Sequence, residues 1–170
     1  MSYMLRAPGM LRALVVVGVA IIACGRVNAQ GVVMQRNLSL EMAKTIAEAA
    51  LAECKSKGYH TTVAVVDRAG QLMVMLRDEQ AGLQTVEMAR RKAYTARTFR
   101  MTTLEFQKRT AGDQPIAAQR NLTDILALGG GAPIQVGTET IGGVGSAGST
   151  LEMDDACAKA GIAKVADLLK

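Results

Sequence analysis

Glycine is concentrated in the last third of this sequence, where eight of the 17 glycines lie between residues 129 and 148. Glycine lacks a Cβ atom, so it permits tight turns and lets a helix approach a strand closely. Residues 143–148, GVGSAG, also match the G-x-G-x-x-G spacing of dinucleotide-binding loops. That fold needs a further parallel strand, whereas the sequence after Ser149 predicts only a helix. We therefore expect turns and close packing, with an anion at the helix N-terminus as the alternative.

The order of helical and extended patterns indicates the fold class. Small residues at helical spacing from Ala43 to Cys54 predict a first helix, and residues 67–70, DRAG, predict a hairpin turn between two strands. The expected helices are 40–57, 85–100, a short helix begun by a capping box of Thr102 and Glu105, and one from its cap at Ser149 to the C-terminus. The expected strands are 61–66, 71–76, 125–128, 134–136 and 139–144. Strands joined by short hairpins are antiparallel. The pattern predicts an α+β domain in which helices pack on a five-stranded antiparallel sheet.

The first 29 residues have the pattern of a secretory signal peptide. Arg6 and Arg12 precede an apolar run of eleven residues, 13–23, and residues 27–29, VNA, form a cleavage site. The run is too short for a comfortable membrane span. We expect an exported protein, periplasmic or secreted, with a flexible lead-in over residues 30–37 and one domain over 38–170. Residues 21–24, IIAC, resemble a lipobox, so a lipoprotein anchored at Cys24 is the alternative.

Charge and aromatic content argue against nucleic acid as a partner. Without the three arginines of the first 29 residues, 17 basic side chains face 15 acidic ones, a net charge of +2. Nucleic-acid-binding domains usually carry a concentrated basic face. Three Tyr, two Phe and no Trp offer no stacking platform for RNA.

Two cysteines, Cys54 and Cys157, fall in predicted helices beside small apolar residues. Such surroundings favour buried free thiols, although the two could pair in an oxidising compartment. Two cysteines and one histidine without a C-x-x-C spacing do not make a structural zinc site.

Few residues offer catalytic chemistry. His60 is the only histidine, and neither Ser146 nor Ser149 lies in a G-x-S-x-G elbow, so we expect no nucleophilic triad. The second predicted helix carries five cations, Arg90, Arg91, Lys92, Arg97 and Arg100, with Tyr94 among them. A solvated basic face is one interpretation. The other is that Lys92 in particular points into a cleft and neutralises the carboxylates of an anionic ligand.

Four segments resemble the GlcG/HbpS-like family in sequence and in order. They are AVVDRAGQLMVMLRD (64–78), ARRKAYTARTF (89–99), LALGGGAPI (126–134) and IGGVGSAGSTLEMDD (141–155). The resemblance runs from about Leu38 to Leu169, so the domain over 38–170 is identified as GlcG/HbpS-like. It implies a profilin-like fold, assembly into homo-oligomers, and binding of haem or a related tetrapyrrole.

The same resemblance implies a set of ligand-binding residues. Its hairpin turn, its K-A-x-T helix, its G-G-G-x-P turn and its acidic helix start are matched here. The residues expected at the ligand are Asp67, Lys92, Tyr94, Thr95, Gly130, Gly131, Glu152 and Asp154. His60 is the candidate axial ligand of a haem iron, because no other imidazole exists to take that role; Tyr94 or a methionine is the alternative donor.

Three functions follow from these observations. The leading one is an exported protein that binds haem or a related tetrapyrrole without a catalytic activity of its own. The second is an enzyme or accessory protein acting on a small carboxylate such as a hydroxy acid, which the cations of the second helix would bind. The third is a sensory or structural partner of a membrane protein.

Overall fold

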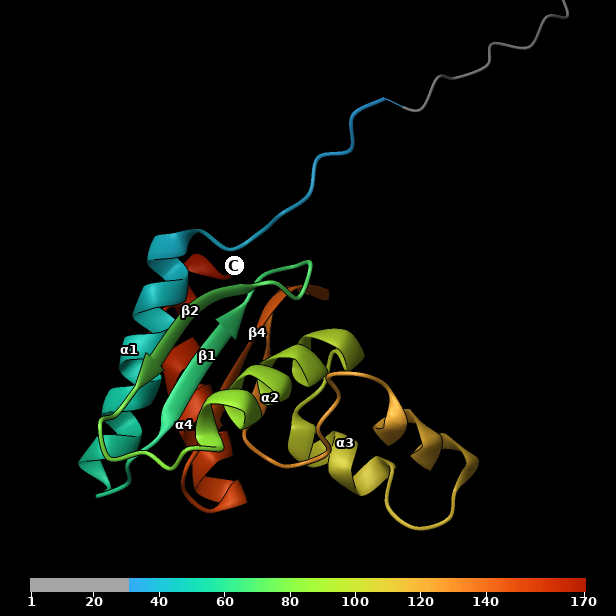
Figure 1. Ribbon diagram of the computed structural model, residues 1–170. Coiled ribbons are helices and arrows are strands. Elements are labelled where there is room, and N and C mark those ends of the chain that lie inside the picture. Colours follow the sequence, from blue (N-terminus) through green and yellow to red (C-terminus); the bar gives the residue numbers. More distant parts are fainter. Residues whose placement is uncertain (1–30) are drawn as a thin grey trace, which may run out of the picture. The chain divides into compact units, whose positions relative to one another are not determined.

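The computed structural model describes residues 31–170, of which Gln35–Lys170 forms one unit (Figure 1). Within it the helices are α1 (Leu40–Ser56), α2 (Thr85–Phe99), α3 (Thr103–Arg109) and α4 (Leu151–Ala163), with 3₁₀ helices over Pro115–Asn121 and Ala166–Leu168; the strands are β1 (Thr62–Val66), β2 (Leu72–Arg77), β3 (Gly131–Val136) and β4 (Glu139–Ala147). The expected signal peptide and Cys24 lie outside the described residues. None of the described helices is long and apolar enough to cross a membrane.

The strands form one antiparallel sheet in the order β2-β1-β4-β3. The α+β class and both expected hairpins are thereby confirmed, with the first turn at residues 67–70 and the second between β3 and β4. The expected fifth strand is wrong, since the described residues form four. The β3–β4 hairpin begins three residues earlier and ends three residues later than the sequence indicated.

The missing strand is the segment 125–128, which α2 holds through side chains. Arg91 Nη2 donates to the carbonyl of Ile125 at 2.5 Å, and the N–H of Leu126 donates to Thr95 Oγ1 at 2.8 Å. Asp124, with a φ of 66°, binds Arg90 at 2.7 Å. Because side chains of α2 already form hydrogen bonds with these backbone groups, the segment does not require a neighbouring strand to satisfy them.

Helices cover both faces of the sheet (Figure 1). Val63 and Val65 of β1 pack with the apolar faces of α1 and α4. Ala64 and Val66, which alternate with them along the strand, pack against Ala89 and Ala93 of α2. All five residues of β1 are buried, so this central strand is enclosed on both sides.

The glycines of β4 lie directly under α2. A Cβ atom at Gly145 would overlap the carbonyl oxygen of Ala89, and one at Gly143 would overlap the carbonyl oxygen of Ala93. Residues 143–147, most of GVGSAG, therefore belong to a strand and serve close packing, as the sequence indicated. A side chain larger than hydrogen would push the helix away from the sheet.

Cys54 of α1 and Cys157 of α4 form a disulfide. The favoured expectation of two free thiols is therefore wrong. The same small neighbours that suit a buried thiol let the two helices approach closely, with the two Cα atoms 5.6 Å apart.

The helix ends follow the expected capping chemistry with one shift. Thr102 and Glu105 form the expected capping box of α3. The N-cap of α4 is Thr150, one residue after the expected Ser149, and its side chain accepts the N–H of Met153. Ser149 instead donates its hydroxyl to Asp154 at 2.6 Å. The last helix also stops at Ala163, short of the C-terminus.

Candidate ligand-binding site

A buried ion pair joins α2 to α4. Lys92 Nζ lies 2.7 Å from Asp154 Oδ2, and the exposed fractions of the two side chains are 0% and 2%. Nζ also donates to the carbonyl of Ser146 in β4 at 2.9 Å. Burial lowers the pKa of Lys92, and the nearby Asp154 carboxylate opposes that shift.

Two glycines expected at the ligand lie against this ion pair. A Cβ atom at Gly130, whose φ is 119°, would stand 2.8 Å from Lys92 Nζ and 2.6 Å from Asp154 Cβ. One at Gly131 would overlap the carbonyl oxygen of Lys92. The turn therefore has no side chain there because the ion pair occupies the space.

These contacts correct the expectation that Lys92 and Thr95 face an open cleft. Both side chains are completely buried and have partners inside the protein. Of the family motif residues, Lys92, Gly130 and Asp154 meet around an interior ion pair, whereas Thr95 holds the backbone of Leu126.

The other expected residues lie elsewhere. Asp67 Oδ1 accepts the N–H groups of Ala69 and Gln71 at 2.8 and 2.9 Å, which fixes the β1–β2 turn. Tyr94 lies against Gly70 of the same turn, where a Cβ atom would stand 2.8 Å from its ring. Glu152 is exposed in the first turn of α4.

His60 binds a carboxylate at the start of β1. Its Nδ1 lies 2.9 Å from Asp78 Oδ1, and Lys55 Nζ lies 3.2 Å from Asp78 Oδ2. Hydrogen bonds lower the pKa of Asp78 to about 2, the largest contribution coming from the backbone N–H of Gln80, followed by Lys55 and His60. His60 lines neither of the two pockets described below.

A hollow of about 530 Å³ lies where α2, α3 and the edge strand β3 meet. We call it the helix pocket; its lining residues are Arg100, Met101, Thr102, Glu105, Arg109, Pro133 and Gln135. Hydrogen bonds from the side chain and then the backbone of Thr102 lower the pKa of Glu105. Arg100 and Arg109 form no ion pair with any residue of 31–170. The pocket thus offers two unpaired cations beside the thioether of Met101.

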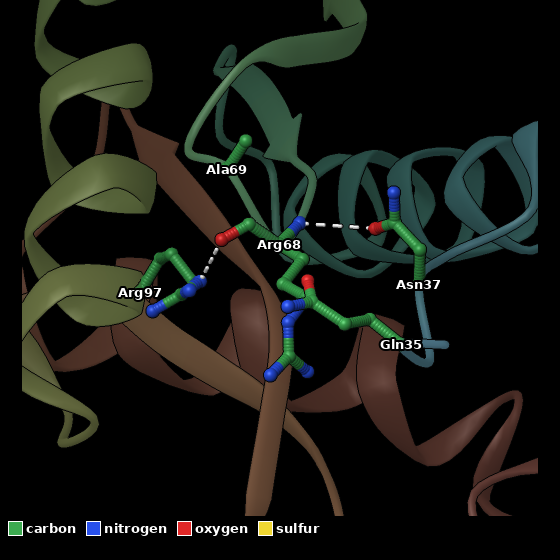
Figure 2. A pocket seen from close by; sticks show the side chains of 5 residues that line it. All are labelled: Gln35, Asn37, Arg68, Ala69 and Arg97. Carbon is green, nitrogen blue, oxygen red and sulfur yellow. Dashed lines mark hydrogen bonds between the residues drawn. The ribbon is translucent and has the colours of Figure 1, made fainter. Parts of the chain in front are cut away.

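A second hollow lies at the β1–β2 turn. It consists of two adjoining parts, of about 300 and 210 Å³, that share Arg68, Ala69 and Arg97. We call it the hairpin pocket. Its other lining residues are Gln35, Asn37, Gly70, Tyr94 and Thr98. Figure 2 shows that Arg97 Nε donates to the carbonyl of Arg68 and that the N–H of Arg68 donates to Asn37 Oδ1, at 2.6 and 3.0 Å.

Sequence reasoning found only part of either pocket. It named Tyr94 and the cations Arg97 and Arg100, and it recognised Thr102 and Glu105 as a helix cap. Pro133 was expected only as the proline of the G-G-G-x-P turn, and Gln35 and Asn37, which reach the hairpin pocket from a distant part of the chain, were missed. No group of three or more His, Cys, Asp or Glu side chains in residues 31–170 is placed to hold a metal ion.

Known proteins are similar to this chain in sequence or in fold. A 15.0 kDa protein from the dhaT–dhaS intergenic region of Citrobacter freundii is 32% identical over 122 residues, which span 69% of this chain and 84% of that protein. The crystal structure of HbpS is 36% identical, covers 81% of this chain and 97% of its own, and superposes with a TM-score of 0.75. The complex of PduOC with heme is 26% identical, covers 75% and 94%, and superposes with a TM-score of 0.66.

The family model described as haem degrading protein HbpS-like matches residues 38–163. These residues include the hairpin turn, the buried ion pair, the glycines of β4 and the start of α4. The chain belongs to the HbpS-like family.

Proposed function

We propose that this protein binds haem or a related tetrapyrrole, and that the helix pocket holds it. The observation that carries the proposal is a pocket of about 530 Å³ that combines two unpaired guanidinium groups with a thioether. Ligand pockets of this size are typical for small molecules and cofactors. The family to which the chain belongs and the heme complex of PduOC support the choice of ligand.

The pocket residues fit the chemistry of such a group. Arg100 and Arg109 would pair with its propionates, because guanidinium binds carboxylates through two parallel hydrogen bonds. Met101 would supply a thioether to the iron, a ligand that haem proteins use. Pro133 would contribute apolar surface to the macrocycle. Bound haem would supply an iron centre for redox chemistry.

The alternative iron ligand is His60. Its Nδ1 lies against Asp78, an arrangement that leaves Nε2 free for a metal. Because His60 lines neither pocket whereas Met101 lines the helix pocket, this proposal assigns the iron to Met101.

Export to an oxidising compartment is part of the proposal. The signal-peptide pattern of residues 1–29 supports it, and so does the disulfide between Cys54 and Cys157, because disulfides persist mainly outside the reducing cytosol. Mass spectrometry of the mature protein tests this. A mature N-terminus at Gln30 is expected, whereas a lipid-modified Cys24 would indicate the lipoprotein instead.

We also propose that the protein forms homo-oligomers. β2 and β3 are the edges of the sheet within the described residues, and β2 carries the apolar sequence LMVML with Leu72 47% exposed. Unprotected apolar edge strands tend to pair with other chains. Light scattering across a dilution series tests this, and a monomeric mass throughout would contradict it.

Absorption spectroscopy during a haemin titration tests ligand binding. We expect a saturable Soret shift for the wild type and binding at least about a hundredfold weaker for the Arg100→Gln, Arg109→Gln double variant, since it loses two charge-assisted contacts worth about 1.5–3 kcal/mol each. Lys108→Gln is the matched control, because Lys108 is an exposed cation of α3 that does not line the pocket. Equal affinity of the double variant and the wild type would remove the helix pocket from the site.

A further inference from the structure

We propose that the hairpin pocket is a second ligand site, separate from the helix pocket, and that it binds a small oxyanion, a carboxylate or a phosphate, through Arg97. The proposal does not depend on haem binding, because the helix pocket contributes no residue to this one.

The acidic groups near this pocket already have partners. Glu139 binds Arg68 through Oε1 and lies 3.6 Å from Arg36 through Oε2. Asp67 uses its carboxylate to hold the backbone of the turn. Arg97 forms no ion pair within residues 31–170, although its side chain lines both parts of the pocket. One guanidinium therefore stands there without a counterion from the described chain.

The surroundings of Arg97 are unfavourable to its charge. Burial lowers its pKa, and repulsion from Arg68 and Arg100 lowers it further, while Asp67 opposes the shift. An oxyanion in the pocket would relieve this repulsion, because it would bring a negative charge into a partly desolvated positive field. Guanidinium remains charged at physiological pH, so the attraction persists there.

The backbone holds Arg97 in place for such a contact. Its Nε donates to the carbonyl of Arg68 at 2.6 Å, which fixes the direction of the guanidinium plane (Figure 2). No hydrogen bond from its Nη1 or Nη2 reaches another residue of 31–170. These two nitrogens can therefore donate hydrogen bonds to a ligand without breaking an existing hydrogen bond to the described residues.

Neutral donors complete the lining. Asn37 accepts the N–H groups of Leu38 and Arg68 through Oδ1, which identifies its other terminal atom as the amide nitrogen, a donor. Tyr94 lines the same hollow and is held by packing against Gly70. Parts of about 300 and 210 Å³ lie at or below the lower end of the usual range for ligand pockets, so the ligand is small.

Calorimetric titration of the purified full-length protein with inorganic phosphate and, separately, with oxalate tests the proposal. We expect saturable binding of one of the two, which tells phosphate from carboxylate recognition. Arg97→Gln should weaken that binding by at least about tenfold, because a charge-assisted hydrogen bond is lost. The affinity of Arg97→Lys should lie between those of the wild type and of Arg97→Gln, since lysine keeps the positive charge but lacks the planar guanidinium group.

The control is Lys108→Gln, which removes a positive charge from α3 and should bind as the wild type does. Circular dichroism of each variant checks that it is folded. If Arg97→Gln does not fold, the affinity of Arg97→Lys still tests the role of the guanidinium group. Absence of saturable binding by both anions in the wild type would overturn the proposal. So would equal affinities of the folded Arg97→Gln variant and the wild type.

Discussion

Lys92 and Asp154 show how two side chains can tie the two helical layers together across the sheet. Each comes from a different face, and the carbonyl of Ser146 in the strand between them accepts a second hydrogen bond from Lys92 Nζ. Removing two charges from water is costly, and their mutual attraction offsets that cost only in good geometry. Loss of one partner would leave an unpaired charge in the interior.

We therefore expect Lys92→Met and Asp154→Leu each to lower the free energy of unfolding by about 3–5 kcal/mol. The double variant should lose less than the sum of the two, because it retains no unpaired charge. Urea denaturation of the four proteins measures these values. Strictly additive losses would show that the two charges do not stabilise one another.

Asp78 links pH to stability at the start of β1. Its pKa is about 2 in the folded protein, below the ordinary value of about 3.9. Its carboxylate therefore contributes stability that is fully present above about pH 4 and is lost as the pH falls through about 2.

We expect the melting temperature of the wild type to exceed that of Asp78→Asn near neutral pH and the difference to shrink between about pH 4 and 2. The asparagine keeps an oxygen that can accept the N–H of Gln80, so the comparison isolates the negative charge. Calorimetry at several pH values provides the measurement. A difference that stays constant down to pH 2 would mean that the charge of Asp78 is not the cause.

At the scale of elements, the contact between α2 and β4 is the tightest constraint in the fold. A Cβ atom at Gly145 would overlap the carbonyl oxygen of Ala89 and stand 2.6 Å from the backbone nitrogen of Ala93. Neither neighbour can move without shifting the whole helix. The structure thus predicts that even one added methyl group is harmful there.

Gly145→Ala should lower the free energy of unfolding by about 1–3 kcal/mol, as overpacking of a core usually does. Gly82→Ala is the matched control, since its Cβ would meet only the flexible end of the Gln84 side chain. Thermal denaturation with and without haemin compares the two. If Gly145→Ala kept full stability and lost only haemin binding, this position would contact ligand rather than packing.

Local patterns predicted most elements, because hairpin turns and helix caps depend on neighbouring residues. The turn at 67–70 and the capping box of Thr102 and Glu105 are confirmed for this reason. The prediction of a strand at 125–128 was wrong because the backbone of this segment forms hydrogen bonds with the side chains of Thr95 and Arg91, about 30 residues earlier in the sequence. Such a side-chain partner leaves no periodic pattern in the segment itself.

The disulfide was beyond prediction for a related reason. Cys54 and Cys157 are 103 residues apart, and only the packing of α1 against α4 brings them together. Composition described the surroundings of each cysteine correctly, as small and apolar. It contained no information about the distance between them.

At the scale of the whole molecule, the residues of the family motifs and the two pockets lie in different parts of the fold. Lys92, Gly130 and Asp154 meet in the interior, where they hold the layers together. The pockets instead combine segments that are distant in the sequence, such as Arg100 with Pro133 and Arg97 with Asn37. The resemblance therefore identified the fold, whereas the candidate sites required the three-dimensional arrangement.

The last turns of α2 contribute to both pockets, with Arg97 in the hairpin pocket and Arg100 in the helix pocket. Each cation raises the positive potential felt by the other. Both pockets are thereby suited to anionic ligands, one small and one large enough for a macrocycle. This difference in size is the basis for assigning them different ligands.

The central claim is that haem occupies the helix pocket, and a nuclear magnetic resonance spectrum of the ¹⁵N-labelled protein with added haemin tests it most directly. Paramagnetic iron broadens the signals of nearby amides. The account predicts selective broadening around Arg100–Thr102, Glu105 and Gln135, and its reduction in the Arg100→Gln, Arg109→Gln variant. Broadening centred on His60, or no saturable broadening anywhere, would contradict it.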